Sequence, residues 1–529
     1  MASIMTPVSI AALLTLLPLA AQAEVPVKTQ WGVVSEPGYP AKVCATLSAT
    51  ITAQNGSIDA YDADGVHTQP DHDRIQKAID SCADGAVKLV AANGAGGFLT
   101  GPLTLKSGVT LWIDKGATLF ASRDPRDYEN GPGDCGVANL ESHKSCHSLI
   151  EGADLVNSGL VGEGRIDGRG GSLLLSGPNK GLRSWWDVAW QSKQGQIQHV
   201  FRLVQLDGGS NLTLYRLTFV NSPNFHLVPS HFTGITAWGI KILTPSMVYT
   251  KPGYACPEGS TPDKVTPATC FTPETVKNTD GFDPVTSTNV LLAYSYITTG
   301  DDNVAIKGGS GGKMSGITRN QVYAHDQFYY GHGMSIGSET YDGVEDVQVT
   351  DLAIDGMESG GGNGLRIKSD STRGGKVSNI LFDGVCMRNE VRPMVFDTHY
   401  GDKTGTRYPN FAGITVRDFH YTGSAKFGGG TLTFRGFEED GQKLPLDITF
   451  ETVVFDGTAP KINGGKGKDA PFAAHIAVKP GATAFGNLIV PSVENDVTIE
   501  HVETIASPGL RDCSKAFVPL SSVLADSPI

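Results

Sequence analysis

The sequence predicts an all-β protein built as a single parallel β-helix, a solenoid of stacked coils with one capping helix at its N-terminal end. Short apolar segments with strand-like alternation recur at intervals of roughly 20 to 35 residues, which is typical of such a solenoid. Most breaks between them carry Gly, Pro, Asp or Asn. Glycine supplies 65 of the 529 residues, well above the usual ~7% and without a collagen-like period. Hairpin turns of the Asn-Gly type are scarce, which disfavours a β-sandwich.

The first 23 residues resemble a secretory signal peptide. They contain no Asp, Glu, Lys or Arg, and an apolar run from Val8 to Ala20 ends in the small-residue pattern Ala21-Gln22-Ala23. The run is too short to span a bilayer. We therefore expect residues 1–23 to be removed and the mature protein to be exported. An N-terminal segment over 24–63 and a β-helix domain over 64–529 complete the predicted organisation.

One amphipathic helix is expected near the start of the β-helix, from Asp73 to Cys82. Its apolar side chains follow the spacing i, i+3, i+4 and i+7, at Ile75, Ala78, Ile79 and Cys82. The terminal coil of a solenoid exposes apolar surface and unpaired strand edges. We expect this helix to cover that open end.

Eight cysteines in an exported chain most simply form four disulfides. Eight cysteines allow 105 connectivities, so the sequence leaves the pairing open. Cys135 with Cys146 and Cys256 with Cys270 are attractive local pairs, which leaves Cys44 with Cys82 and Cys386 with Cys513. No Cys-x2-Cys or Cys/His cluster is present, so we expect no metal and no cofactor.

The formal net charge is −13, which makes nucleic acid an improbable partner. An anionic ligand would have to be met by a local cationic cluster that works against the overall field. After residue 23 no stretch is apolar enough for a transmembrane helix, so we expect no membrane partner. The expected product is a soluble, extracellular monomer.

Two segments interrupt the repeat and are expected to project from the solenoid as loops. Residues 168–198 contain Trp185, Trp186 and Trp190, and residues 249–277 contain five prolines and two cysteines. Loops of this length in a compact domain tend to be functional. The tryptophans could stack on a sugar ring or be buried under their own loop, and the sequence favours neither.

Four polar clusters lie at the ends of predicted strands: Asn278-Thr279-Asp280, Gly300-Asp301-Asp302, Gly331-His332-Gly333 and Arg366-Ile367-Lys368. The interval from Asp280 to Asp301 is 21 residues (301 − 280), about one coil of a solenoid. Carboxylates on adjacent coils ~4.8 Å apart would share one patch. One of them should then have a raised pKa, which provides both the proton donor and the base that glycoside hydrolysis requires.

A structural explanation of each cluster competes with the chemical one. Single Asp residues are common at solenoid corners, where they accept hydrogen bonds from local amides, and a His between glycines is often a turn residue. Arg366 and Lys368 are two apart on a strand and point to one face. That arrangement fits a carboxylate-bearing ligand as well as an ordinary solvated strand.

In this order, the four clusters resemble the signature motifs of the polygalacturonases, glycoside hydrolase family 28. Segments such as Asn221-Ser222-Pro223-Asn224-Phe225-His226 are also similar to the family, and the resemblance covers roughly Asp64 to Gly457. It implies a right-handed parallel β-helix. It also implies inverting hydrolysis of the α-1,4 bonds of polygalacturonate, the de-esterified backbone of pectin.

The same resemblance implies roles for individual residues. It assigns catalysis to Asp301 as the general acid, to Asp280 and Asp302 as the pair that activates water, and to His332 as the residue that tunes the acid. It assigns substrate binding to Asn278, Arg366, Lys368 and Tyr400.

Three alternatives remain open at this point. An exo-acting relative would need loops that close one end of the groove, and the insertion at 249–277 could supply them; a single internal insertion is weak support, so we favour endo-action. A pectate lyase would share substrate and fold but would require Ca²⁺ and an Arg or Lys base. A non-catalytic carbohydrate-binding β-helix would keep its function when Asp301 is replaced by Asn.

Overall fold

The computed structural model describes residues 25–140, 146–191, 195–309, 316–464, 470–502 and 509–526. The predicted signal peptide, residues 1–23, lies outside the described residues. Among the described residues, no helix combines the length and the apolar character needed to cross a bilayer.

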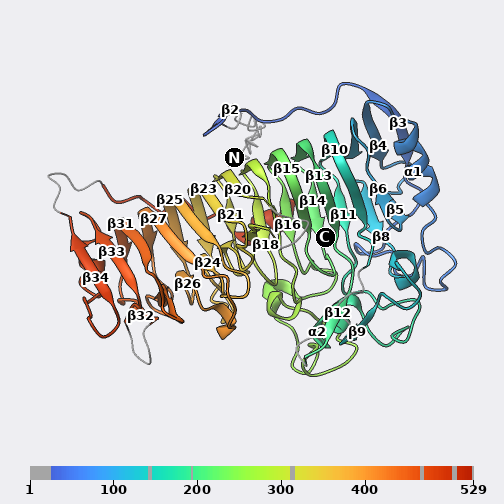
Figure 1. Ribbon diagram of the computed structural model, residues 1–529. Helices are drawn as coiled ribbons and strands as arrows, with labels where there is room; N and C mark the ends of the chain where they lie inside the picture. Colours follow the sequence, from blue (N-terminus) through green and yellow to red (C-terminus); the bar gives the residue numbers. More distant parts are fainter. Residues whose placement is uncertain are drawn as a thin grey trace, which may run out of the picture.

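The chain forms a right-handed parallel β-helix, as the sequence predicts (Figure 1). A 22-stranded sheet and a six-stranded sheet run along the solenoid, and neighbouring coils pair in parallel register in both. Few helices are present among the described residues, which agrees with the expected all-β class.

The longer strands of the 22-stranded sheet stack from the N-terminal to the C-terminal end. They are β3 (Val43–Ser48), β4 (Gly85–Val90), β7 (Val109–Ile113), β10 (Ile150–Val161), β13 (Val204–Tyr215), β15 (Leu227–Trp238), β17 (Thr288–Ala293), β20 (Thr318–Ala324), β23 (Val344–Asp355), β25 (Lys376–Arg388), β27 (Asn410–Tyr421), β31 (Leu446–Phe455), β33 (Ala474–Val478) and β34 (Val497–His501).

Shorter strands of the same sheet follow most of them in each coil: β5 (Gly97–Thr100), β6 (Leu103–Thr104), β8 (Thr118–Ala121), β11 (Arg165–Asp167), β14 (Thr218–Val220), β16 (Lys241–Leu243), β18 (Tyr296–Thr298) and β21 (Gln327–Phe328). The six-stranded sheet comes next in each coil and consists of β19 (Val304–Ile306), β22 (Met334–Ile336), β24 (Leu365–Lys368), β26 (Met394–Asp397), β28 (Thr431–Arg435) and β32 (Lys461–Asn463). The polar clusters singled out in the sequence lie along this six-stranded sheet.

Left-handed residues bend the long strands at one corner of the solenoid. Asn157, Asn211, Asn289, Asn320 and Asn379 have φ between 52° and 57°. Asparagine tolerates this conformation better than most residues with a side chain. The side chains also join neighbouring coils, since Asn211 donates to Asn157 at 3.0 Å. The recurring Asn therefore marks a corner of the coil.

The core fills the inside of the solenoid with stacked aliphatic and aromatic side chains. Phe382, Phe396, Phe434 and Phe450 form a continuous stack, with ring centroids 5.4 to 6.2 Å apart. Each coil therefore packs its apolar residues on those of the coils above and below it, and the open ends need separate cover.

Helix α1 (His72–Ser81) covers the N-terminal end of this core, as predicted. Ile75 and Ile79 are buried, and the helix contacts β3, β4 and β6. Strand β3, from within 24–63, pairs in parallel with β4 and so belongs to the main sheet. The preceding residues form an antiparallel pair, β1 (Val27–Thr29) and β2 (Gly32–Val34).

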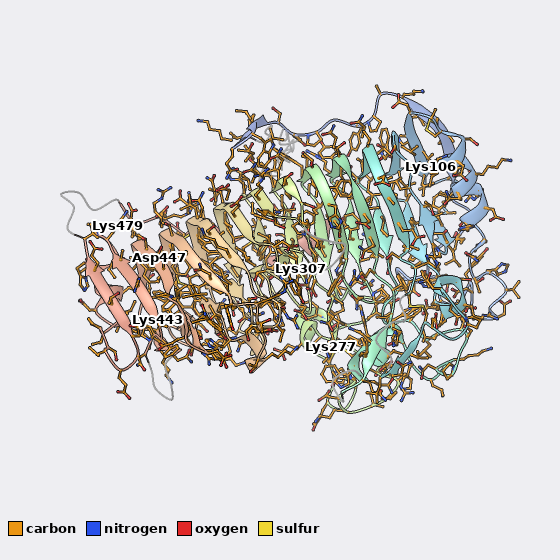
Figure 2. All side chains as sticks on the ribbon, viewed as in Figure 1. Lys106, Lys277, Lys307, Lys443, Asp447 and Lys479 are labelled. Carbon is orange, nitrogen blue, oxygen red and sulfur yellow. A yellow bond between two sulfur atoms is a disulfide. The ribbon has the colours of Figure 1, made fainter. Side chains whose placement is uncertain are left out.

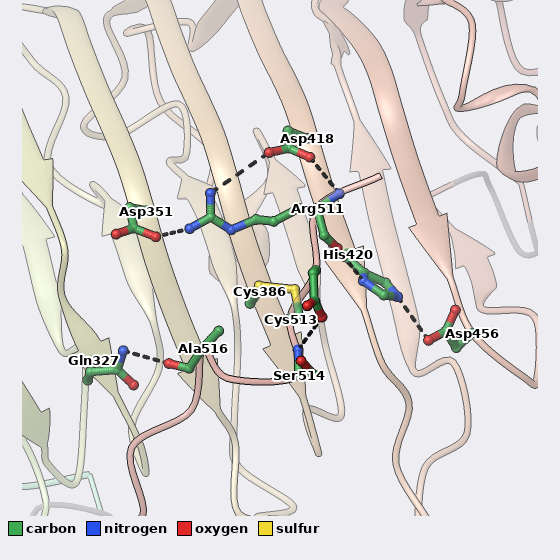
Figure 3. Close-up of a disulfide and its surroundings, with 11 residues drawn as sticks. Gln327, Asp351, Cys386, Asp418, His420, Asp456, Arg511, Cys513, Ser514 and Ala516 are labelled. Atoms are coloured by element: carbon green, nitrogen blue, oxygen red, sulfur yellow. Dashed lines mark hydrogen bonds and ion pairs between the residues drawn. A yellow bond between two sulfur atoms is a disulfide. The ribbon is translucent and has the colours of Figure 1, made fainter. Parts of the chain in front are cut away.

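The four disulfides join the predicted partners: Cys44–Cys82, Cys135–Cys146, Cys256–Cys270 and Cys386–Cys513. The last one anchors the C-terminal tail on the outside of the coils (Figure 3). Arg511 pairs there with Asp351 and Asp418. Helix α4 (Leu520–Asp526) ends this tail, and its Leu520 and Val523 pack beside Tyr329, two residues before Gly331. The tail therefore runs back from the C-terminal coils to the middle of the solenoid (Figure 1).

The two predicted insertions project on one side of the solenoid (Figure 1). The first contains helix α2 (Trp185–Gln191) and strand β12 (Ile197–His199), which pairs with β9 (Val137–Asn139). The second contains two 3-10 turns, η3 (Pro252–Tyr254) and η4 (Pro273–Thr275). The remaining elements are η1 (Pro125–Tyr128), η6 (Tyr400–Asp402), the hairpin β29 (Phe437–Glu439) and β30 (Gln442–Leu444), and α3 (Thr483–Gly486).

Candidate active site

The predicted carboxylates lie on adjacent coils. Phe282 pairs in parallel with Val304, and the amide of Gly281 donates to the carbonyl of Asp302 at 2.9 Å. The register between these coils is 22 residues (304 − 282), one more than the interval from Asp280 to Asp301. Asp280 is therefore level with Asp302 in the ladder, and Asp301 lies at the turn just before it.

Asp302 is almost fully buried and is held by three side chains. Lys368 donates to its Oδ2 at 2.6 Å, Arg366 to its Oδ1 at 3.3 Å, and Ser335 to its Oδ1 at 2.8 Å. The prediction that Arg366 and Lys368 share one face is confirmed by these contacts. Ser335 was not predicted; it pairs with Arg366 in the β22–β24 ladder, so only the register between coils reveals it.

Asp301 is more open, with its side chain 20% exposed. Nδ1 of His332 lies 2.9 Å from its Oδ1, and Asn278 donates to its Oδ2 at 3.2 Å. Burial alone would raise the pKa of Asp301, but the His332 imidazole beside it, with further help from Lys368 and Arg366, holds that pKa below its ordinary value. The contact with His332 thus controls the charge of Asp301.

Asp280 is buried, and its pKa is shifted in the direction opposite to that of Asp301. Its Oδ1 has no hydrogen-bond partner among the described residues. Burial, followed by the negative charges of Asp301 and Asp283, raises the pKa of Asp280 well above its ordinary value. The expected pKa difference within the carboxylate group is therefore present, with the proton favoured on Asp280 and disfavoured on Asp301.

The main chain of Asp280 is fixed by a buried histidine. The amide of His226 donates to the Asp280 carbonyl at 2.8 Å, and its Nδ1 donates to the same oxygen at 3.0 Å. Nε2 then accepts from the Thr244 hydroxyl at 2.7 Å. Burial lowers the pKa of His226 to about 4, so the ring is neutral and serves as a structural donor near neutral pH.

Two glycines of the clusters are required by close backbone approaches. A Cβ on Gly300 would lie 2.1 Å from the carbonyl oxygen of Val276, and one on Gly333 would lie 2.0 Å from that of Gly364. Gly333 also has a φ of +73°, which favours glycine. These positions explain why Asp301 and His332 are each preceded or followed by glycine.

Tyr400 lies beside the cationic pair. Its ring centroid is 5.2 Å from the guanidinium carbon of Arg366 and 5.3 Å from Nζ of Lys368, and it is 37% exposed. All eight candidate residues of the sequence therefore gather along the six-stranded sheet. Asp301, Asp302 and His332 also present atoms within 4.8 Å of one another.

A cavity of about 590 Å³ opens beside Asp301 and His332. The two insertions supply its outer wall, including Trp190 from the first and Glu274 and Lys277 from the second. In Figure 2, Lys307 lies within the stacked coils, whereas Lys277 lies toward the projecting loops. The cavity therefore lies between the coils that carry Asp301 and His332 and the projecting loops.

The tryptophans of the first insertion divide between two locations. Trp185 and Trp186 are fully buried, so burial is the correct alternative for them, although the aromatic rings that pack on them lie outside their own loop. Trp185 packs on Tyr128 and Phe201. Trp186 packs on Tyr249 and Phe271 of the second insertion. Trp190 is partly exposed and lines the cavity. Trp186 and Trp190 are four residues apart on α2 and so lie on nearly the same helix face. Their different exposure depends on what packs around the helix, which no sequence motif indicates.

The chain matches the model of the "Glycosyl hydrolases family 28" over residues 82–427. This protein belongs to glycoside hydrolase family 28. It is 56% identical over 95% of its length to a protein named polygalacturonase from Ralstonia solanacearum, of which the match covers 95%. It is 40% identical over 72% of its length to an endo-polygalacturonase from Pectobacterium carotovorum subsp. carotovorum, of which the match covers 82%.

A solved family 28 structure shares the fold. The polygalacturonase of Erwinia carotovora ssp. carotovora superposes with a TM-score of 0.65 and 36% identity, over 84% of this chain and 98% of that one. Relatives named for endo-action and for exo-action both match the chain. Membership of family 28 makes the protein a glycoside hydrolase.

Proposed function

We propose that this protein hydrolyses the α-1,4 bonds between galacturonate units in polygalacturonate, as an endo-acting and inverting enzyme. One observation carries the proposal: three carboxylates on adjacent coils lie directly beside two cations on the same face. Carboxylates supply the acid and base of glycoside hydrolysis. Arginine and lysine supply the binding partners that an anionic sugar chain needs in a protein of net charge −13.

Asp301 is the general acid in this proposal, and His332 sets its charge. Asp301 is the exposed member of the carboxylate group and faces the cavity. In the free protein its pKa is held low by His332. A bound polyanion brings further negative charge, which raises the pKa of Asp301 and favours its protonated form. Asp301, in contact with His332, then carries the proton that it gives to the leaving oxygen.

Asp280 and Asp302 hold the attacking water. The free Oδ1 of Asp280 offers an acceptor beside Asp302, whereas Asp302 is fixed by Lys368 and Arg366. Asp280 must lose its proton to act as a base. Since its pKa is raised, the base function is expected to be lost as the pH falls through that raised pKa.

Substrate binding falls to Arg366, Lys368, Tyr400 and Asn278. Arg366 has only one contact to Asp302 and retains donors for a galacturonate carboxylate. Tyr400 offers a partly exposed ring beside both cations. Asn278 bridges toward Asp301 and orients its Oδ2. Four disulfides support the further proposal that the enzyme acts outside the cell.

The test is an assay of wild type and Asp301→Asn on polygalacturonate, with products sized over time. Hydrolysis by the wild type and its loss in Asp301→Asn are expected. A wild type that releases unsaturated products, and loses activity with a Ca²⁺ chelator, would instead be a lyase. Inversion is checked by NMR of the first-formed product, and an α-configured product would contradict it.

Exo-action is the second candidate, and one observation favours it. The insertion at 249–277, held by Cys256–Cys270, forms part of the cavity wall beside Asp301. If it closes the groove, one short product appears from the start of the reaction. If the groove is open, the viscosity of polygalacturonate falls well ahead of the release of reducing ends.

A further inference from the structure

Arg202 lines a cavity of the β-helix, and no carboxylate among the described residues is in direct contact with it. Its neighbours Phe201 and Leu203 are buried in the core, so alternation along the extended chain directs Arg202 outward. Its Nη1 donates to Oε1 of Gln205 at 2.5 Å, and its guanidinium carbon lies 4.9 Å from the centre of the Phe225 ring. Within the described part of the chain it forms no ion pair with a carboxylate. Neutral groups therefore make the direct contacts to this cation. The carboxylates of Asp283 and Asp280 act on it only from beyond hydrogen-bond distance.

A polar cavity of about 480 Å³ contains this side chain. Its wall consists of β12 and of the coils that lie on the N-terminal side of Asp280. It shares no lining residue with the cavity beside His332. Its only carboxylate among the lining residues, Glu151, is paired with His147 at 3.1 Å. Arg202 is thus the cation of a polar cavity whose acid is already engaged.

The cavity is linked to the carboxylates by the main-chain ladder. The amide of Leu203 donates to Phe225, and that of His226 donates to Asp280. The coil of Arg202 is therefore two steps from that of Asp280, about 10 Å at ~4.8 Å per step. Arg366 and Lys368 lie on the other side of Asp302, toward the C-terminal coils. Cations consequently flank the carboxylates in both directions along the solenoid.

Hydrogen bonds between side chains also connect the Arg202 cavity to Asp301. Gln198, which lines the Arg202 cavity, donates to Oδ1 of Asn278 at 2.8 Å. Asn278 in turn donates to Asp301 at 3.2 Å. A ligand that fills the Arg202 cavity would therefore lie beside a residue that orients the proposed acid.

We propose that Arg202 binds the carboxylate of a galacturonate unit away from the scissile bond, on the N-terminal side of the groove. This inference rests on the proposed function and extends it by a binding subsite. The guanidinium fork matches a carboxylate geometrically. An oligogalacturonate must extend beyond the units at the scissile bond to reach it. A subsite on this side, added to Arg366 and Lys368 on the other, gives the substrate a hold on both sides of Asp301, as cleavage inside a chain requires.

The experiment compares wild type, Arg202→Gln and Arg202→Lys on trigalacturonate, hexagalacturonate and polygalacturonate. For Arg202→Gln we expect kcat/KM on the two longer substrates to fall about tenfold or more, mainly through KM. Trigalacturonate should be cut at nearly the wild-type rate. The position at which hexagalacturonate is cut should also shift, because one end of it has lost its anchor. Arg202→Lys keeps the charge and should recover part of the loss.

Arg319→Gln is the matched control, since Arg319 lies on β20 with its side chain 54% exposed. It should change neither rate nor cleavage position. Equal losses on trigalacturonate and hexagalacturonate, or no loss on either, would overturn the inference. If Arg202→Gln does not fold, the same comparison between wild type and Arg202→Lys decides. A wild type that is inactive on every galacturonate refutes the proposed function itself, which is a different result.

Discussion

Two buried charge clusters in this molecule use similar residues in opposite ways. One joins Asp59 and Asp62 to Arg123 and Arg169 near the N-terminal end. Arg169 donates to Asp62 at 2.6 Å and to Asp59 at 2.6 Å, and Arg123 donates to Asp62 at 2.8 Å. Two carboxylates meet two guanidinium groups there. The cluster along the six-stranded sheet instead combines three carboxylates with Arg366, Lys368 and His332.

The difference lies in hydrogen bonding as well as in charge. In the N-terminal cluster, every buried polar atom of the four side chains has a hydrogen-bond partner. In the cluster along the six-stranded sheet, Oδ1 of Asp280 and Nε of Arg366 are buried and have no hydrogen-bond partner among the described residues. Burial raises the pKa of Asp59, yet Arg169 and Arg123 outweigh it and leave that pKa below its ordinary value. A cluster in which every polar atom is hydrogen-bonded stabilises the fold. A cluster with an unpaired acceptor can also bind and release a proton, as acid–base chemistry requires.

The largest effect is expected at Asp301, where the comparison places the proton donor. Asp301→Asn preserves the size of the side chain and removes the acid, so kcat on polygalacturonate should fall about 10²- to 10⁴-fold. The melting temperature should fall, because His332, Lys368 and Arg366 favour the charged form of Asp301 in the folded protein. Initial rates and thermal unfolding measured on the same preparation check both statements. Retained activity would remove Asp301 from the mechanism.

Arg169→Met should act on stability rather than chemistry. It leaves the fully buried Asp62 and the partly buried Asp59 with one cation fewer, which should lower the free energy of unfolding by about 3–5 kcal/mol. Chemical denaturation measures that loss, and the activity per folded molecule should stay near wild type. A loss of kcat without a loss of stability would mean that this cluster serves the reaction after all.

Glu390 tests a third arrangement, a buried carboxylate that forms no ion pair with any residue that the structure describes. It accepts main-chain bonds from Val391 and Arg392 at 2.9 and 3.4 Å, and burial raises its pKa to about 8. The folded protein therefore binds a proton that the unfolded chain has released, so stability falls as the pH rises from about 4.5 to about 8. Glu390→Gln should reduce this slope and stabilise the protein by about 1–3 kcal/mol at pH 9 relative to pH 4. If the difference in unfolding free energy between Glu390→Gln and the wild type is the same at pH 4 and pH 9, the raised pKa of Glu390 is contradicted.

The smallest expected effect is a gain in stability at Asp280. Its raised pKa means that ionisation is unfavourable in the folded state, so stability is lost as the pH rises through that pKa. Asp280→Asn removes the penalty and should raise the melting temperature by ~1–2 °C near neutral pH, and by less at pH 4. The rate of hydrolysis should fall in the same variant, because the proposed base is removed. Unchanged activity would exclude Asp280 as a base.

The sequence by itself determined the class of fold, the capping helix and which residues make up each of the four polar clusters. These features are encoded locally: strand alternation, turn residues and an apolar stripe are readable within a single coil. Short loops favoured two of the disulfides, Cys135–Cys146 and Cys256–Cys270, but the structure decided the pairing of all eight cysteines. The positions of the candidate residues were likewise predictable, since each motif lies at the end of a strand and neighbouring coils repeat.

Only the tertiary structure decided how those residues are paired. Coil register depends on the length and path of every intervening loop, so the step of 22 rather than 21 residues that sets Asp280 opposite Asp302 could not be read from one chain. The same holds for the engagement of Lys368 with Asp302 and for the unpaired cation at Arg202. The wall that two distant insertions build beside Asp301 is also a tertiary feature, because it joins segments about 80 residues apart whose contact no local pattern records.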